Sequence, residues 1–375
     1  MAPRPVNPFT TAKRVVIKIG SALLIDGERN EIRQTWLRTV LEDVVACRAN
    51  GQQILIVSSG AIALGRRVLG LPQGPLRLEE RQASAACGQV RLAHAYQEEL
   101  ARHSLGGAQV LLTPFDTEEW KSYLNVRATL RNLLGFNVIP VINENDTVTT
   151  PMRRFGDNDR LAARVAAMVE ADCLVLLSDI DGLFTANPRI DPKATLVPEV
   201  FAMTPEIMAM AGESASVFSS GGMVTKLEAA RIALKAGCTM AITRGDIPHP
   251  LAHLAQGKPC TWFLPSVSPV AARKIWIAGS LNPRGSLRID AGAVQALDNG
   301  KSLLPVGVTS VVGEFSRGDA VRVVTAQGNE IARGLIAYGS DDAKRIVGRR
   351  SDEFESLLGY TGAEELIHRD DLALL

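Results

Sequence analysis

The chain has 375 residues, 46% of them hydrophobic and 22% charged, so it can bury a sizeable core. Its length predicts about two domains. Its 41 Lys and Arg residues balance 40 Asp and Glu residues, which excludes a protein that binds nucleic acid or membranes through its overall charge.

The cysteines and the N-terminal residues predict a cytoplasmic protein. The five cysteines are odd in number and widely spaced, unlike a disulfide framework or a zinc site built from CxxC pairs. They are Cys47, Cys87, Cys173, Cys238 and Cys260. Residues 1–14 contain no apolar core of signal-peptide length, and no apolar run reaches the roughly 18 residues of a membrane-spanning helix.

Residues 14–264 alternate short apolar runs with amphipathic helical segments. Six of the runs have the continuous hydrophobicity of parallel strands that are buried on both faces. They occupy residues 14–20, 52–60, 108–113, 137–143, 172–179 and 238–243. Helices are expected between them, at the apolar stripe 36–45 and over residues 79–101, 118–134, 158–170 and 223–236. The alternation predicts an α/β fold, an αβα sandwich with a mainly parallel sheet.

The pattern changes beyond Pro265. Residues 266–283 are expected to form a linker that leads into a strand, and short strands then alternate with glycine turns. The expected strands lie at 286–290, 310–313, 320–325 and 330–338. We therefore predict a first domain over residues 1–265 and a small, separate, β-rich domain over residues 284–375.

Polar residues lie at the ends of the first two predicted strands, where ligands of parallel sheets bind. Lys18 lies within an apolar run, and burying its charge is costly unless an anion such as phosphate meets it. The alternative is a lysine that extends from the strand end into solvent. Ser59 lies at the end of the second predicted strand, just before a helix, so it either caps that helix or helps its amides to bind a carboxylate or phosphate.

A crowded polar segment follows the fourth predicted strand. Four carboxylates and three amides lie close together in the sequence, and like charges at such spacing raise one another's pKa. A cation that shares the site, such as an ammonium group or a magnesium-bound phosphate, would explain the crowding. The alternative is a solvated turn with a helix cap. The residues are Asn143, Glu144, Asn145, Asp146, Asp157, Asn158 and Asp159.

Two later segments are candidate nucleotide contacts. Gly221 and Gly222 come just before a predicted helix whose first turn carries Thr225 and Lys226, a phosphate-binding pattern that differs from the GxxxxGK[ST] loop. Residues 178–179 end the fifth strand, where a nucleotide's sugar and base could lie or the chain could simply turn. Lysines, glycine-rich helix starts and a carboxylate cluster at one edge of one sheet together favour phosphoryl transfer.

These motifs, in this order, resemble those of the amino acid kinase family. They are KIGS with Lys18, SSGAIALG with Ser59, PVINEND, FGDND, and SGGMVTK with Lys226. Within the family they match the enzymes that use ATP to phosphorylate the γ-carboxylate of glutamate at the start of proline synthesis. The residues after about 284, including FSRGD and the ending HRDD, resemble a PUA domain. The resemblance covers nearly the whole chain.

The resemblance implies which residues act on the phosphates. Lys18 and Lys226 would neutralise charge on the nucleotide and on the transferring phosphoryl group, and Asp159 would organise both lysines. No protein base is then required, because the γ-carboxylate of glutamate is already ionised near neutral pH. Mg²⁺ would arrive on ATP, with no metal ligand assigned. The implied ATP-binding residues are Lys18, Ser178, Asp179, Ser220, Gly221, Gly222, Met223, Val224, Thr225 and Lys226.

The resemblance also implies how glutamate is held. Ser59, Asp146 and Asn158 match glutamate-binding positions, and Asp146 is expected to face the α-ammonium group. Residues 147–155, which separate the two acidic motifs, are expected to form a flap over bound glutamate. Feedback inhibition by proline and a homo-oligomer, either a dimer or a tetramer, are further implications.

The chain departs from the family pattern at three positions. It has Ser178 where threonine is common, SSGGM in place of GTGGM, and Asn187 where an aspartate is usual. Serine keeps the hydroxyl group, so these changes bear only on the fine geometry of nucleotide binding.

Two other functions stay open. One is the synthesis of a different acyl phosphate, as in acetylglutamate kinase or aspartokinase. The other is RNA binding through the PUA domain, although residues 284–350 hold ten Lys and Arg residues against seven Asp and Glu residues, a small positive surplus.

Overall fold

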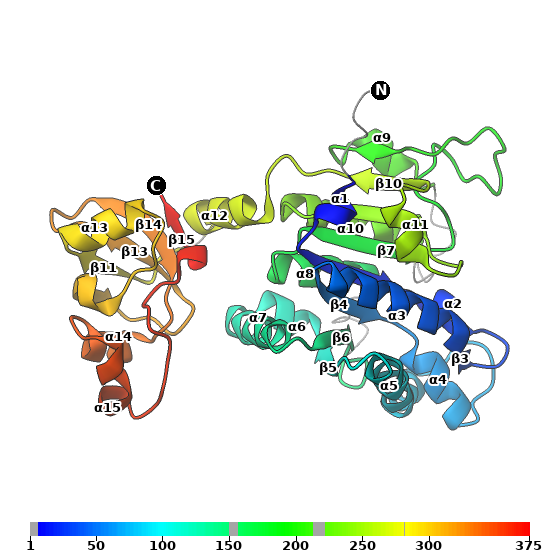
Figure 1. Cartoon of the computed structure of the whole chain (residues 1–375), viewed down its shortest axis with the longest axis horizontal. Helices are drawn as coiled ribbons and strands as arrows, with labels where there is room; N and C mark the ends of the chain where they lie inside the picture. Colours follow the sequence, from blue (N-terminus) through cyan, green and yellow to red (C-terminus); the bar gives the residue numbers. More distant parts are fainter. Residues whose placement is uncertain (1–6, 150–156, 213–221, 281) are drawn as a thin grey trace. The chain divides into compact units, whose positions relative to one another are not determined.

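The computed structural model describes residues 7–149, 157–212, 222–280 and 282–375 (Figure 1). Ser220, Gly221 and residues 150–155 of the expected flap lie outside the described residues. The chain divides into two compact units, Met1–Pro269 and Val270–Leu375, and the division falls within the stretch 266–283 that was expected as a linker. No helix of the described residues is long and apolar enough to cross a membrane.

The first unit is built on an eight-stranded sheet. Its strand order is β5-β6-β4-β1-β7-β9-β10-β8. The strands are β1 (Arg14–Ile19), β4 (Gln53–Ser58), β5 (Gly107–Leu112), β6 (Ile139–Glu144), β7 (Cys173–Ser178), β8 (Glu199–Val200), β9 (Thr239–Arg244) and β10 (Cys260–Phe263). The six predicted strands are confirmed and all run parallel, while β10 pairs antiparallel with β9. β5 lies at the edge and is only partly buried, unlike the prediction for it.

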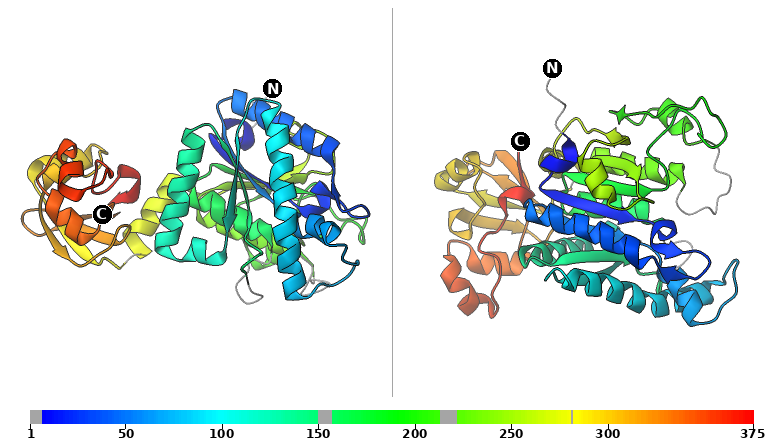
Figure 2. Two further views of the ribbon diagram at one scale, coloured as in Figure 1. Left: turned by 90° about the horizontal axis from the view of Figure 1, so that it is seen from below. Right: turned by 45° about the vertical axis from the view of Figure 1, so that its right-hand side comes forward.

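Helices cover both faces of this sheet (Figure 1, Figure 2). Because strand side chains alternate, Val15 and Ile17 of β1 belong to one core and Val16 to the other. The first core includes residues of α3 (Gln34–Ala49), α4 (Ala61–Val68), α5 (Leu78–Ala101) and α11 (Pro250–Ala255). The second includes residues of α7 (Trp120–Gly135), α8 (Asn158–Met168) and α10 (Met223–Lys235). The shorter elements are α1 (Pro8–Thr11), α2 (Ser21–Leu24), α6 (Pro114–Glu118), α9 (Pro205–Ala209) and the hairpin of β2 (Ile25–Asp26) and β3 (Glu31–Ile32).

Two glycines bring α4 and α5 into close backbone contact. A Cβ on Gly65 of α4 would lie 1.7 Å from the carbonyl oxygen of Ser84, and one on Gly88 of α5 would lie 1.8 Å from that of Ala61. No side chain fits such distances, so the contact requires glycine on both helices. It fixes α5 firmly against α4, whose first residue, Ala61, lines the cavity described below.

Asp43 of α3 holds the start of α11. Its carboxylate accepts hydrogen bonds from the backbone amides of Leu251 at 2.9 Å and Ala252 at 3.2 Å. Nδ1 of His249, a residue with a left-handed φ of 52°, lies 2.9 Å from the same carboxylate. This buried acid therefore caps one helix from another.

We expect Asp43→Ala to lower the free energy of unfolding by about 2 kcal/mol, because two backbone amide donors, one of them buried, lose their acceptor. Urea unfolding checks this. Asp43→Asn is the matched control: it keeps a side-chain oxygen for the amides and should lose less. Equal losses in the two variants would contradict the capping role.

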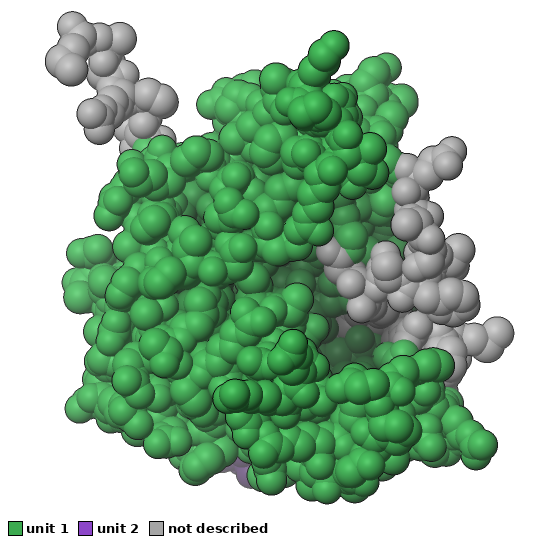
Figure 3. Space-filling view, turned by 90° about the vertical axis from the view of Figure 1, so that its right-hand side faces the viewer, with its two compact units in different colours: residues 1–269 green, residues 270–375 purple. Residues whose placement is uncertain are grey.

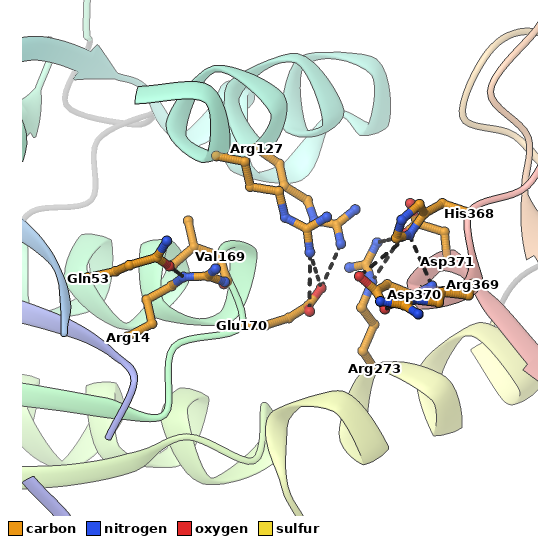
Figure 4. A network of polar contacts seen from close by, with 11 residues as sticks. Arg14, Gln53, Arg127, Val169, Glu170, Arg273, His368, Arg369, Asp370 and Asp371 are labelled. Carbon is orange, nitrogen blue, oxygen red and sulfur yellow. Dashed lines mark hydrogen bonds and ion pairs between the residues drawn. The ribbon is translucent and has the colours of Figure 1, made fainter. Parts of the chain in front are cut away.

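A partly buried ion cluster lies at the turn that follows α8 (Figure 4). Glu170 accepts from Nη2 of Arg127 at 2.6 Å and from Nη2 of Arg131 at 3.3 Å, so both arginines of α7 bind this turn. Arg14 of β1 donates to the carbonyl oxygen of Val169 and, at 2.9 Å, to Gln53 Oε1. The cluster therefore anchors α7, the α8–β7 turn and β1 together.

The second unit is a five-stranded sheet with its own core, which includes Leu287, Val321 and Phe354. Its order is β12-β11-β13-β14-β15. The strands are β11 (Gly285–Ile289), β12 (Val308–Gly313), β13 (Ala320–Val324), β14 (Glu330–Leu335) and β15 (Leu372–Leu374), and the helices are α13 (Ala291–Asp298), α14 (Ser340–Ile346) and α15 (Phe354–Leu358). The four predicted strands are confirmed.

Part of the stretch expected as a linker is a helix. α12 covers Pro269–Ser280, and Arg273 on this helix forms an ion pair of 2.6 Å with Asp371, so the helix is held within the second unit (Figure 4). Proline is well tolerated at the start of a helix, and the following residues are mostly apolar or alanine. Pro269 is therefore the first residue of a helix in a stretch where a linker was expected.

Candidate active site

A cavity of about 790 Å³ lies at the carboxyl ends of β1, β4, β6 and β7. It opens on the hollowed face of the first unit (Figure 3). Seven of the predicted site residues line it: Lys18, Ser59, Asp146, Asn158, Ser178, Asp179 and Lys226. The residues come from widely separated motifs, which the parallel sheet brings to one edge.

Asp159 contacts both predicted lysines. Its Oδ1 lies 2.6 Å from Nζ of Lys18, and its Oδ2 lies 3.0 Å from Nζ of Lys226. Thr225 Oγ1 donates to the same Oδ2 at 3.2 Å. The Asp159 side chain is fully buried, and the side chains of Lys18 and Lys226 are 6% and 7% exposed, so little of the cluster is accessible to solvent. Both lysines also line the cavity, where an anion could bind to two ammonium groups whose positions Asp159 fixes.

The local structure around these charges explains their positions. Lys18 is the fifth residue of β1, Asp159 the second of α8, and Lys226 lies in the first turn of α10. Asp157 is the N-cap of α8, and its Oδ1 accepts from the amide of Asp159 at 2.7 Å. The same Oδ1 lies 3.9 Å from Nζ of Lys18. Asp157, which the sequence left without a role, is thus both a helix cap and a second carboxylate near this lysine.

The pKa shifts in this cluster favour the charged forms of Lys18 and Asp159. Burial, the largest influence on Lys18, lowers its pKa, but the charges of Asp159 and Asp157 outweigh burial and hold the pKa above its usual 10.5. Burial likewise raises the pKa of Asp159, but the two lysines outweigh it and hold that pKa below its usual 3.8. Lys18 and Asp159 are therefore both ionised at any pH between 3.8 and 10.5.

The predicted glutamate residues Ser59 and Asn158 are in direct contact. Nδ2 of Asn158 donates to Ser59 Oγ at 2.8 Å, to Asn143 Oδ1 at 2.8 Å and to the carbonyl oxygen of Ser58 at 3.1 Å. Sequence reasoning did not assign Asn143 a role. Its signal was an amide within a buried apolar strand, which is costly unless it has hydrogen-bond partners.

Asp146 lines the same cavity from the loop after β6. Gln82 of α5 donates to the carbonyl oxygen of Thr149 at 3.2 Å and so fixes the described part of this loop. The rest of the expected flap, residues 150–155, lies outside the described residues.

The expected nucleotide residues lie in two groups. Ser178 and Asp179 line the cavity at the end of β7, and Gly222 is the N-cap of α10, which begins with Met223, Val224, Thr225 and Lys226. Asp179 Oδ2 forms an ion pair of 2.7 Å with Nη2 of Arg189, a residue that sequence reasoning missed. Burial raises the pKa of Asp179, but the contact with Arg189 contributes most to a net lowering.

The chain is similar to known proteins over nearly its whole length. The model of the amino acid kinase family matches residues 13–244, and that of the PUA domain matches residues 285–358. A glutamate 5-kinase from Paramagnetospirillum magneticum is 58% identical over 369 residues, which are 98% of this chain and 100% of that protein. One from a Bradyrhizobium strain is 56% identical over 362 residues, 96% of each chain.

Similarity to a solved structure is weaker. Carbamate kinase from Giardia lamblia bound to AMP-PNP has a TM-score of 0.49 and 16% sequence identity, over 68% of this chain and 100% of that one. The chain belongs to the amino acid kinase family and carries a C-terminal PUA domain.

Proposed function

We propose that this protein transfers the γ-phosphoryl group of ATP to the γ-carboxylate of L-glutamate and so makes L-glutamyl 5-phosphate for proline synthesis. The observation that carries the proposal is the buried cluster of Lys18, Asp159 and Lys226 at the cavity. The substrate is proposed from relatives named glutamate 5-kinase that are more than half identical to the chain. The same relatives favour glutamate over acetylglutamate or aspartate.

The cluster suits phosphoryl transfer, a reaction that depends on positioned positive charge and here needs no general base. A carboxylate oxygen of glutamate attacks the γ-phosphorus, the bond from that phosphorus to the bridging oxygen breaks, and ADP leaves with the electron pair. Charge builds up on the phosphoryl oxygens and on ADP during this step, and Lys18 and Lys226 would meet it. Asp159 would hold both ammonium groups at fixed positions before the substrates bind.

The rest of the cavity suits the two substrates. Asp146 offers a carboxylate for the α-ammonium of glutamate, while Ser178, Asp179 and the start of α10 would contact the nucleotide. Mg²⁺, when bound on the triphosphate, would spread the charge of the phosphate oxygens. The carboxylates of Asp157 and Asp179 line the cavity and are oxygen ligands of the kind that this ion takes.

Trapping of the product tests the reaction class. An acyl phosphate reacts with hydroxylamine to give a hydroxamate, so the purified protein with ATP, Mg²⁺, glutamate and hydroxylamine should form glutamyl hydroxamate. Formation should depend on both ATP and glutamate. ADP release without hydroxamate would contradict transfer to a carboxylate.

We expect Asp146→Ala to raise the KM for glutamate roughly 30-fold, because a charge-assisted contact with the ammonium group is lost. The KM for ATP should change little. Asp146→Asn is the matched control, because it has the same shape without the charge and should lose nearly as much. A KM for glutamate that stays near the wild-type value in both variants would exclude the ammonium contact.

We also propose that the protein acts in the cytoplasm as a homo-oligomer and is inhibited by proline. Support comes from the resemblance of its motifs to the family. Titration of proline into the assay and sedimentation of the purified protein test inhibition and assembly. The proline site is proposed to overlap the loop after β6 that is expected to cover glutamate, so inhibition that glutamate does not relieve would contradict it.

A further inference from the structure

A line of side-chain amides leads from the candidate glutamate site to the edge of the sheet. Asn158 of α8 donates to Asn143 of β6 at 2.8 Å, and Nδ2 of Asn143 donates to Oε1 of Gln89 at 2.9 Å. Nε2 of Gln89, on α5, then donates to Oε1 of Gln109 on β5 at 3.2 Å. The first three amides are buried and Gln109 is exposed. The line crosses four elements of the first unit.

Two backbone groups fix the direction of every bond in this line. The carbonyl oxygen of Ser58 can only accept, so the atom of Asn158 that faces it must be the NH₂ group. The backbone amide of Glu144 can only donate, and it lies 2.9 Å from Oδ1 of Asn143. Asn143 must then turn its own NH₂ group toward Gln89, which has to present its oxygen.

The direction of these hydrogen bonds determines which donor groups remain available to a substrate. The NH₂ group of Asn158 has two hydrogens and three acceptors, namely Ser59 Oγ, Asn143 Oδ1 and the Ser58 carbonyl oxygen. It therefore has no hydrogen left for a substrate carboxylate. Ser59 Oγ already accepts from Asn158, so its own hydrogen is directed elsewhere, and Ser59 lines the cavity. The hydroxyl of Ser59 is thus held as a donor.

We propose that Gln89 is a positioning residue that stabilises this arrangement together with the backbone amide of Glu144, and the inference rests on the proposed function. By accepting from Asn143, it helps the Glu144 amide to keep Asn143 Oδ1 turned toward Asn158, which keeps the Ser59 hydroxyl available to a carboxylate oxygen of glutamate. Gln89 is well suited to this task because its neighbour Gly88 locks α5 against α4. Without the Gln89 oxygen, the NH₂ group of Asn143 would be buried without an acceptor, and the amide would shift from the position in which its oxygen accepts from Asn158 and Glu144.

Three variants separate positioning from packing. Gln89→Met keeps the length of the side chain but removes the acceptor. Gln89→Glu keeps the acceptor, and the exposed Gln109 can turn its amide to donate to it. Gln52→Met is the matched control, because Gln52 is a buried amide that donates to the carbonyl oxygens of Phe9 at 2.8 Å and Ala12 at 2.9 Å, away from the cavity.

The measurement is the KM for glutamate and for ATP in each variant, together with the thermal midpoint. We expect Q89M to raise the KM for glutamate about tenfold and to leave the KM for ATP within about twofold. Q89E should stay within about threefold of the wild type for both substrates. Q52M should lose thermal stability as Q89M does, with both KM values unchanged. If Q89M is insoluble, Gln89→Leu replaces it, since it also lacks an acceptor.

A wild-type KM for glutamate in Q89M, or equal increases in Q89M and Q89E, would overturn the positioning role. An increase in Q52M equal to that in Q89M would also overturn it, because the effect would then follow from lost stability. Failure of the proposed function is a distinct result: wild-type protein would then release no ADP in response to glutamate.

Discussion

Lys226→Ala is expected to lower kcat by roughly 10³-fold, which corresponds to about 4 kcal/mol of transition-state stabilisation. Its ammonium group lies 3.0 Å from Asp159 at the edge of the cavity, where charge would build up on the transferring phosphoryl group. The fold should persist, because Asp159 keeps its 2.6 Å contact with Lys18. Initial-rate kinetics and far-UV circular dichroism check both parts.

Lys235→Ala is the matched control for that variant. Lys235 lies on the same helix, in its last turn, and its side chain is exposed. We expect its kcat to stay near the wild-type value. If the kcat of Lys226→Ala approached that of Lys235→Ala, the assignment of Lys226 to the phosphate site would be contradicted.

Asp159→Asn should impair both turnover and stability. The change leaves two buried lysines without their shared carboxylate, and loss of one partner from a buried ion pair destabilises a protein by about 3 kcal/mol. Turnover should fall because neither ammonium group is then held in place. Urea unfolding and steady-state kinetics at neutral pH measure the two effects.

The same variant should change the pH dependence in a defined direction. In the wild type the pKa of Lys18 is above 10.5, so its contribution to stability is complete below 10.5 and is lost as the pH rises through the folded value. Asp159 contributes above 3.8 and loses its contribution as the pH falls through its own, lower folded value. Without Asp159, the effect of burial on Lys18 outweighs the remaining attraction to Asp157, so the pKa of Lys18 falls. The decrease of kcat on the basic side of the pH profile should therefore begin at a lower pH. An unmoved basic limb would contradict the role of Asp159.

The sequence predicted the sheet and the charged cluster for one physical reason. Parallel strands place their carboxyl ends at one edge, so Lys18 near the end of β1 and the helix starts that carry Asp159 and Lys226 were expected at the same edge. The contact of Asp159 with both lysines was implied only by the family resemblance. The strands themselves are continuous apolar runs, which are reliable signals. The catalytic and binding roles of these residues stay predictions.

What the sequence did not predict depends on contacts between distant residues. Gln89 reaches Asn143 across 54 positions, and neither residue stands in a motif that indicates hydrogen bonding to the other. The same holds for Arg189, whose contact with Asp179 depends on how an irregular loop folds back. The antiparallel β10 and the helix α12 were also missed, because their short apolar segments lie among prolines and glycines that usually indicate loops.

The most direct test of the proposed function is ADP release by the purified protein with L-glutamate, N-acetyl-L-glutamate and L-aspartate in parallel. Asp146 would suit a free ammonium group, which the acetylated substrate lacks, and aspartate is one methylene too short to place its carboxylate equally well. We predict rapid ADP release with glutamate and rates near the background with the other two. Faster release with acetylglutamate or aspartate, or no glutamate-dependent release, would contradict a glutamate kinase.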